Sequence, residues 1–192
     1  MPGFPRPFAS EDADEETFDE YDGFAPENLP DPGPFLSDAD VLTGEAHLDF
    51  HRTTREIFEE RGVYDVTFGY NLARLNLDGR HPDAGFRYGV APDDPDVLLA
   101  EFTPTTEFCP QSDTLTVGAF RAWNGLSERH DYDLVSVAVS PMHHQSDEIN
   151  ERLRRLADRL RDGDGDVDVV EKNETDPYRD ADDGDDGPAT PF

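Results

Sequence analysis

The spacing of apolar residues divides the middle of the chain into alternating helical and extended segments. Residues 43–61 carry apolar positions at roughly helical spacing, with Thr43 as a candidate N-cap and Gly62 as a candidate terminator. From Val63 to Gly79 the period changes to two, which predicts a strand that ends at a turn. Residues 80–96 are rich in Gly, Pro and Asp and predict a long loop containing a candidate edge strand at residues 86–90.

The second half of the chain has clearer periods. Residues 97–103 form a short apolar run typical of a buried strand, and a helical pattern follows from Ser112. Residues 134–140 alternate valines with smaller residues and predict another strand. The last helix should begin with Ser146 as its cap, because an apolar stripe at Ile149, Leu153, Leu156 and Leu160 follows it.

These segments predict a small α/β (α+β) sandwich with the order α-β-β-α-β-α. We expect a three- to four-stranded mixed sheet with helices packed on it, spanning residues 41–161. The acidic segments 1–40 and 162–192 are expected to be disordered. Aromatic residues are scattered among the acidic residues of the first segment. This pattern fits either a partner-docking segment or, as the favoured interpretation, a solvated acidic tail.

The charge and the cysteine count mainly exclude classes of function. The formal net charge is −29, and Lys172 is the single lysine, as in proteins of salt-loving archaea. No basic patch favours nucleic acid, and every apolar run is far shorter than the roughly 20 residues of a membrane span. A single cysteine excludes an internal disulfide. Without a recognisable signal peptide, we expect a cytoplasmic protein.

Candidate chemistry lies in two loops that each follow a strand and precede a helix. The first contains Cys109, and the second contains His143 and His144. If the two strands are parallel, both loops lie at the same sheet edge, where a thiolate and an imidazole could bind iron or zinc or act as nucleophile and base. The competing interpretation is a buried, inert cysteine with a histidine in a turn. His47 and His51 share a helix face, and an ordinary exposed pair is favoured there over a metal site.

The same two loops resemble the SufT-like family of iron–sulphur assembly proteins, which includes eukaryotic cytosolic targeting adaptors and PaaD-like proteins. The resemblance rests on Thr103-Pro104-Thr105 leading to Cys109, and on a later motif that aligns His143, Asn150 and Leu153. Met142 replaces the usual threonine, Glu107-Phe108 precede the cysteine, and no cysteine-rich C-terminal segment is present.

The resemblance implies an assembly or maturation factor that is not an enzyme. Its site would be Cys109 with His143 and His144, supported by Thr103, Pro104, Thr105, Ser146 and Asn150. Its cargo would be a transient iron–sulphur cluster or iron, and its partners would be apoprotein clients and other assembly proteins. A homodimer would supply a second Cys109. The alternatives are an interaction adaptor with a structural Cys109 and, less favoured, a Cys/His thiol hydrolase or transferase.

Overall fold

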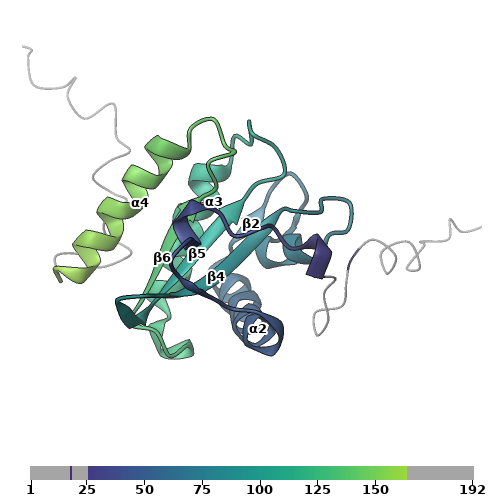
Figure 1. Cartoon of the computed structure of the whole chain (residues 1–192). Coiled ribbons are helices and arrows are strands. Elements are labelled where there is room, and N and C mark those ends of the chain that lie inside the picture. The colour runs from purple at the N-terminus through teal and green to yellow at the C-terminus, as the bar shows by residue number, and fades with distance from the viewer. Residues whose placement is uncertain (1–17, 19–25, 164–192) are drawn as a thin grey trace, which may run out of the picture.

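The computed structural model describes Phe18 and residues 26–163, and its helices and strands form one mixed α/β arrangement (Figure 1). In chain order the helices and strands are β1 (Asp40–Val41), α2 (Gly44–Arg61), β2 (Tyr64–Asp65), β3 (Tyr70–Asn71), β4 (Gly85–Ala91), β5 (Asp94–Thr103), α3 (Ser112–Gly125), β6 (Leu134–Val139) and α4 (Ser146–Arg161). Short 3-10 helices lie at Pro26–Asn28, Pro34–Leu36, Leu72–Leu77 and Ser127–Arg129. Gly62 ends α2 in the left-handed conformation at φ 70°, as predicted.

The main sheet has four strands in the order β1-β4-β5-β6. β4 and β5 form an antiparallel hairpin, whereas β5 and β6 are parallel and are joined through α3. Because parallel strands need a crossover, α3 packs on the sheet and both β5 and β6 end at the same edge. The predicted mixed α/β fold is confirmed.

The hydrophobic core lies between the sheet and the helices α2 and α3. Trp123 of α3 is fully buried, and its ring packs against Phe58 of α2 at 4.9 Å and Phe86 of β4 at 5.2 Å between centroids. The indole N–H donates to Thr54 Oγ1 at 3.1 Å, which satisfies its one polar group. α4 contacts β6 and α3, and Figure 1 shows it on the β6 side of the sheet.

The region between residues 63 and 96 differs from the prediction. The expected strand over 63–79 is instead a small hairpin of β2 and β3 followed by a 3-10 helix at Leu72–Leu77. The expected loop contains the whole of β4, and β4 lies inside the sheet between β1 and β5, so the edge-strand assignment was wrong. Glycine is required within this strand, since a Cβ at Gly89 would lie 2.8 Å from the Ala39 Cβ. The glycines of β4 therefore resembled loop composition, although close packing requires them.

The segment before β1 also packs on the domain, so the predicted boundary at residue 41 falls too late. Leu36 is 1 % exposed. Glu101 of β5 is buried on the same side and accepts hydrogen bonds from the backbone N–H groups of Gly33 at 2.7 Å and Phe35 at 3.3 Å. Burial raises the pKa of Glu101, while these two bonds oppose the rise. The disorder expected for residues 1–17, 19–25 and 164–192 lies outside the described residues.

Two asparagine side chains each bind the backbone N–H and C=O of one residue in β6. Asn124 of α3 accepts from Val135 N–H and donates to Val135 C=O, both at 2.9 Å. Asn150 of α4 does the same to Val139, at 2.7 and 2.9 Å. β6 is an edge strand, and each amide covers a pair of groups that would otherwise be open to another chain.

Candidate functional site

The structure brings the Cys109 loop and the 140–145 loop together at the carboxyl ends of β5 and β6. Ser140 N–H donates to Phe102 C=O at 2.8 Å, which extends the parallel ladder by one bond. Beyond it, His144 donates to Glu107 C=O twice, from its backbone N–H at 3.0 Å and from its ring Nδ1 at 2.8 Å. The loops are therefore fixed to each other by several hydrogen bonds to backbone carbonyls.

The imidazole of His143 contacts the backbone of Cys109 and uses both of its nitrogens. Nε2 lies 2.9 Å from Cys109 C=O, and Gln145 N–H donates to Nδ1 at 3.2 Å. A carbonyl can only accept and an amide N–H can only donate, so these partners select the neutral tautomer with the proton on Nε2. The residue is 2 % exposed. His143 thus joins the two loops, and neither nitrogen is left for a metal or for the thiol in this arrangement.

Cys109 lies in a turn that leads into α3. Its N–H donates to Thr106 C=O and its C=O accepts from Ser112 N–H, both at 3.3 Å, while the residue is partly exposed. Of the preceding motif, Thr103 ends β5, Pro104 is buried and Thr105 is partly buried. The backbone of the turn is fixed on both sides, so the cysteine has a defined position within it.

The supporting residues in α4 are placed differently from each other. Asn150 binds the end of β6, and so it holds the strand from which the 140–145 loop departs. Ser146 is the first residue of α4 and not its cap; the cap position belongs to Gln145, which makes no side-chain capping bond. The backbone N–H of Ser146 donates to His143 C=O at 3.0 Å, and this bond closes a tight turn over residues 143–146.

Exposed apolar side chains lie on the Cys109 loop and on the two loops hydrogen-bonded to it, which the sequence patterns did not reveal. Val66 is 79 % exposed, Phe108 63 % and Met142 43 %. Gln111 joins the Val66 turn to the cysteine loop, accepting from Val66 N–H at 3.3 Å and donating to Thr67 Oγ1 at 2.5 Å. The Phe108 ring lies 5.1 Å from the His144 ring. We call Val66, Phe108, Cys109, Met142 and His144 the loop-edge patch.

The described residues do not form a complete metal site. Within Phe18 and residues 26–163, no group of three or more His, Cys, Asp or Glu side chains is arranged to hold a metal ion. At the loop edge, the thiol of Cys109 and Nε2 of His144 are the soft or borderline donors that remain, since His144 Nδ1 already donates to Glu107. A cluster or iron would therefore need further ligands from outside this set.

His47 and His51 are not the exposed pair that their spacing predicted. They are 1 % and 3 % exposed, and both rings pack near Tyr88 of β4. His51 Nε2 donates to Ala73 C=O and Nδ1 accepts from Tyr88 O–H, both at 2.8 Å. Burial lowers the pKa of His51 to about 4; burial and the neighbouring His51 and Arg87 lower the pKa of His47 to about 3. These imidazoles are neutral core residues.

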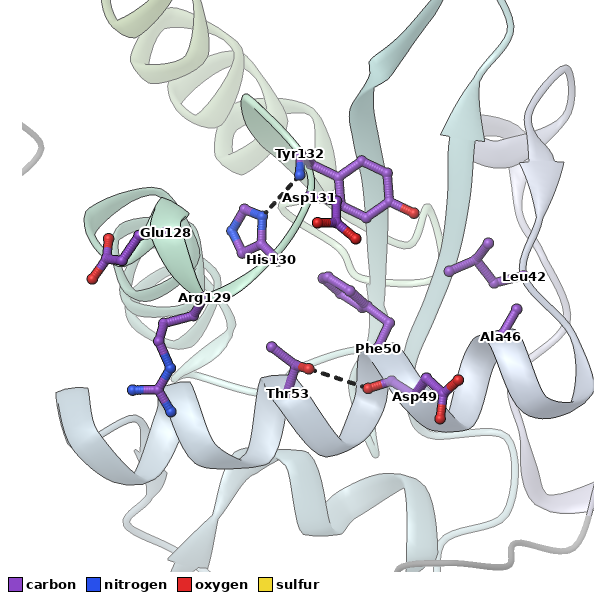
Figure 2. Close-up of a pocket in the computed structure, with 10 residues that line it drawn as sticks. All are labelled: Leu42, Ala46, Asp49, Phe50, Thr53, Glu128, Arg129, His130, Asp131 and Tyr132. Atoms are coloured by element: carbon purple, nitrogen blue, oxygen red, sulfur yellow. Dashed lines mark hydrogen bonds between the residues drawn. The ribbon is translucent and has the colours of Figure 1, made fainter.

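A surface hollow of about 310 Å³ lies at the other end of β6, between α2 and the 128–132 segment (Figure 2). Its histidine, His130, has both nitrogens engaged, with Nε2 3.0 Å from Trp123 C=O and Nδ1 accepting from Tyr132 N–H at 3.2 Å. Arg129 pairs with Glu56 and Glu60 of α2. The 128–132 segment leads into β6, and the 140–145 loop leaves its other end. The hollow and the loop-edge patch therefore lie at opposite ends of the sheet.

No helix in residues 26–163 combines the length and apolar character that a bilayer span requires. No curated protein and no solved structure matches the chain. A family model does match residues 16–167, which is most of the chain, and it is described as a domain of unknown function, DUF7998. The chain therefore belongs to the DUF7998 family.

Proposed function

We propose that this protein is a non-enzymatic iron–sulphur assembly or maturation factor that uses the loop-edge patch. The observation that carries the proposal is the meeting of the Cys109 loop with the 140–145 loop, through His143 and His144. These are the two loops that resemble the SufT-like family. In the proposal, the thiol of Cys109 takes iron or a cluster, or contacts a client thiol, at the centre of an apolar docking surface.

The cluster is cargo in this proposal and not a resident cofactor. One chain offers Cys109 and His144, whereas a cluster normally takes about four protein ligands. The others would come from the client or from a second copy of the chain. An incomplete ligand set favours release, because the receiving protein can complete the coordination with its own thiolates.

The exposed apolar residues support a role in protein contact. A chain with a net charge of −29 has abundant carboxylates for its surface, yet Val66, Phe108 and Met142 are exposed on the Cys109 loop and its two neighbouring loops. Apolar patches rimmed by polar residues mark interaction surfaces more often than chance exposure does. A cytoplasmic, salt-adapted setting belongs to the same proposal, and the acidic composition and the lone cysteine support it.

Anaerobic reconstitution with ferrous iron and sulphide tests the carrier function. We expect bound iron and sulphide that are lost in Cys109→Ser and reduced in His144→Ala. His130→Ala is the control, since His130 lines the hollow at the opposite end of the sheet from the loop-edge patch. Full binding by Cys109→Ser would show that Cys109 is not the ligand.

A second candidate is an interaction adaptor in which Cys109 is structural. The engagement of both His143 nitrogens favours it, because the imidazole then has no role beyond holding the loops. Crosslinking to an apoprotein client separates the two functions. The adaptor requires that Phe108→Ser and Met142→Ser weaken capture while Cys109→Ser does not; the carrier requires that Cys109→Ser also abolishes cluster transfer.

A further inference from the structure

An aromatic residue of the acidic N-terminal segment is seated on the folded domain. Phe18 forms an isolated antiparallel bridge with Asp78 and is partly buried. Its ring meets the Tyr70 ring edge-on, with 5.6 Å between centroids. The guanidinium carbon of Arg74 lies 3.8 Å from the Phe18 ring centroid, and that of Arg80 lies 5.2 Å from it. One aromatic ring and two cations therefore contact this phenyl ring.

A buried carboxylate fixes the surface that receives Phe18. The Asp78 side chain is 0 % exposed and accepts from Arg80 Nε and Nη2, both at 2.8 Å. Tyr70 O–H donates to the same carboxylate at 2.9 Å. Burial alone would raise the pKa of Asp78, but the hydrogen bonds from Arg80 and Tyr70 hold it below its ordinary value. We call Tyr70, Arg74, Asp78 and Arg80 the Phe18 site.

The chemistry of the Phe18 site defines what it can bind. Arginine over a ring face attracts an aromatic side chain, and the bridge at Asp78 requires an extended backbone. The charge of Arg74 favours carboxylates beside that aromatic residue, since Arg80 is already paired with Asp78. The sequence around Phe18 has this character, with Glu15 and Glu16 three and two residues before it and Asp19-Glu20 directly after it.

We propose that the Phe18 site recognises an extended peptide of a partner protein, carrying an aromatic residue flanked by carboxylates, and that Phe18 of the same chain competes for the site. A tethered segment acts at an effective concentration on the order of millimolar. A partner therefore gains access when its own segment binds more tightly than the tethered one or when Phe18 is removed. This proposal is independent of the function of Cys109.

The test is an NMR titration of the full-length chain with a synthetic peptide of residues 13–20, ADEETFDE. It compares the wild type, Phe18→Ala, and Phe18→Ala combined with Arg74→Ala. A further variant combines Phe18→Ala with Arg52→Ala, which removes an α2 arginine paired with Asp49. Control peptides replace the phenylalanine by leucine or alanine. The dispersion of the amide spectrum reports that each variant is folded.

We expect the peptide to shift the amides of residues 70–80 in Phe18→Ala, with binding at least about tenfold weaker in the wild type because the site is occupied. Loss of Arg74 should weaken binding to Phe18→Ala about tenfold, whereas loss of Arg52 should leave it nearly unchanged. The leucine peptide should bind more weakly than the phenylalanine peptide. Equal binding to wild type and Phe18→Ala would overturn the competition, and shifts outside residues 70–80, or none, would overturn the site.

Discussion

Two histidine pairs in this protein have opposite surroundings, yet in each pair one histidine has both ring nitrogens bound to neighbouring protein groups. His47 and His51 lie on α2 inside the core, whereas His143 and His144 lie in a loop beside an exposed apolar patch. The sequence predicts an ordinary exposed pair at the first position and a metal-binding or reactive site at the second. In the structure, His51 and His143 each place both ring nitrogens on neighbouring protein groups.

The two pairs differ in the parts of the molecule that their hydrogen bonds join. His51 links a backbone carbonyl to Tyr88 within the core, so it belongs to the packing of the domain. His143 links two loops that bear the proposed site. An imidazole has two polar atoms that must be satisfied when buried, and the nearest backbone groups often satisfy them first. Of the loop pair, His144 retains one ring nitrogen for other chemistry.

Replacing His51 should have the largest effect. We expect His51→Ala to lower the free energy of unfolding by about 3 kcal/mol, because it opens a cavity and leaves the Tyr88 hydroxyl and the Ala73 carbonyl without this partner. Urea denaturation measures the loss. Arg52→Ala, the next residue on the helix, should cost less than about 0.5 kcal/mol. A small loss in His51→Ala would mean that the core does not depend on the imidazole.

Acid should weaken the core pair before it affects most carboxylates. An unfolded histidine binds a proton near pH 6.5, while burial lowers the pKa of His51 to about 4 and of His47 to about 3. Stability is therefore fully present above pH 6.5 and decreases as the pH falls toward these values. From pH 6.5 to 5, the loss should be about 1.6 kcal/mol for His51 alone. Urea denaturation at a series of pH values measures how steeply the free energy of unfolding depends on pH. This dependence should be weaker in His51→Phe, and an unchanged dependence would assign it to other groups.

Replacing His143 should act on the loops more than on the core. We expect His143→Ala to cost about 1–2 kcal/mol, since it removes the bonds to Cys109 C=O and Gln145 N–H. Alkylation of Cys109 should become faster, because the loop opens more often. A slower reaction in His143→Ala would contradict this prediction and show that the imidazole activates the thiol.

His144 should show the smallest effect on stability. We expect His144→Ala to change the free energy of unfolding by less than about 0.5 kcal/mol, because the residue is exposed and its backbone N–H bond to Glu107 remains. Thermal unfolding measures it, alongside iron binding in the same variant. A loss comparable to that of His143→Ala would make His144 a second structural link and remove it from the proposed ligands.

The second half of the fold could be predicted because its periods are strong and local. The valine alternation of β6 and the apolar stripe of α4 match the structure, as do the strand over 97–103 and the helix that follows Ser112. The convergence of the Cys109 and His143 loops followed from one topological condition, that β5 and β6 be parallel. Alternation and helical spacing depend on side chains within one element, and a sequence displays them directly.

Tertiary contacts decided the rest. β4 contains glycine because Ala39 lies close to Gly89 and Asn76 lies close to Gly85, so the composition of the strand resembled a loop. The buried state of His47 and the backbone partners of His143 depend on residues distant in sequence. Charge, the single cysteine and the strong periods were thus fixed by the chain alone. Which polar groups an imidazole meets depends on how distant segments pack, and only the folded structure determines that.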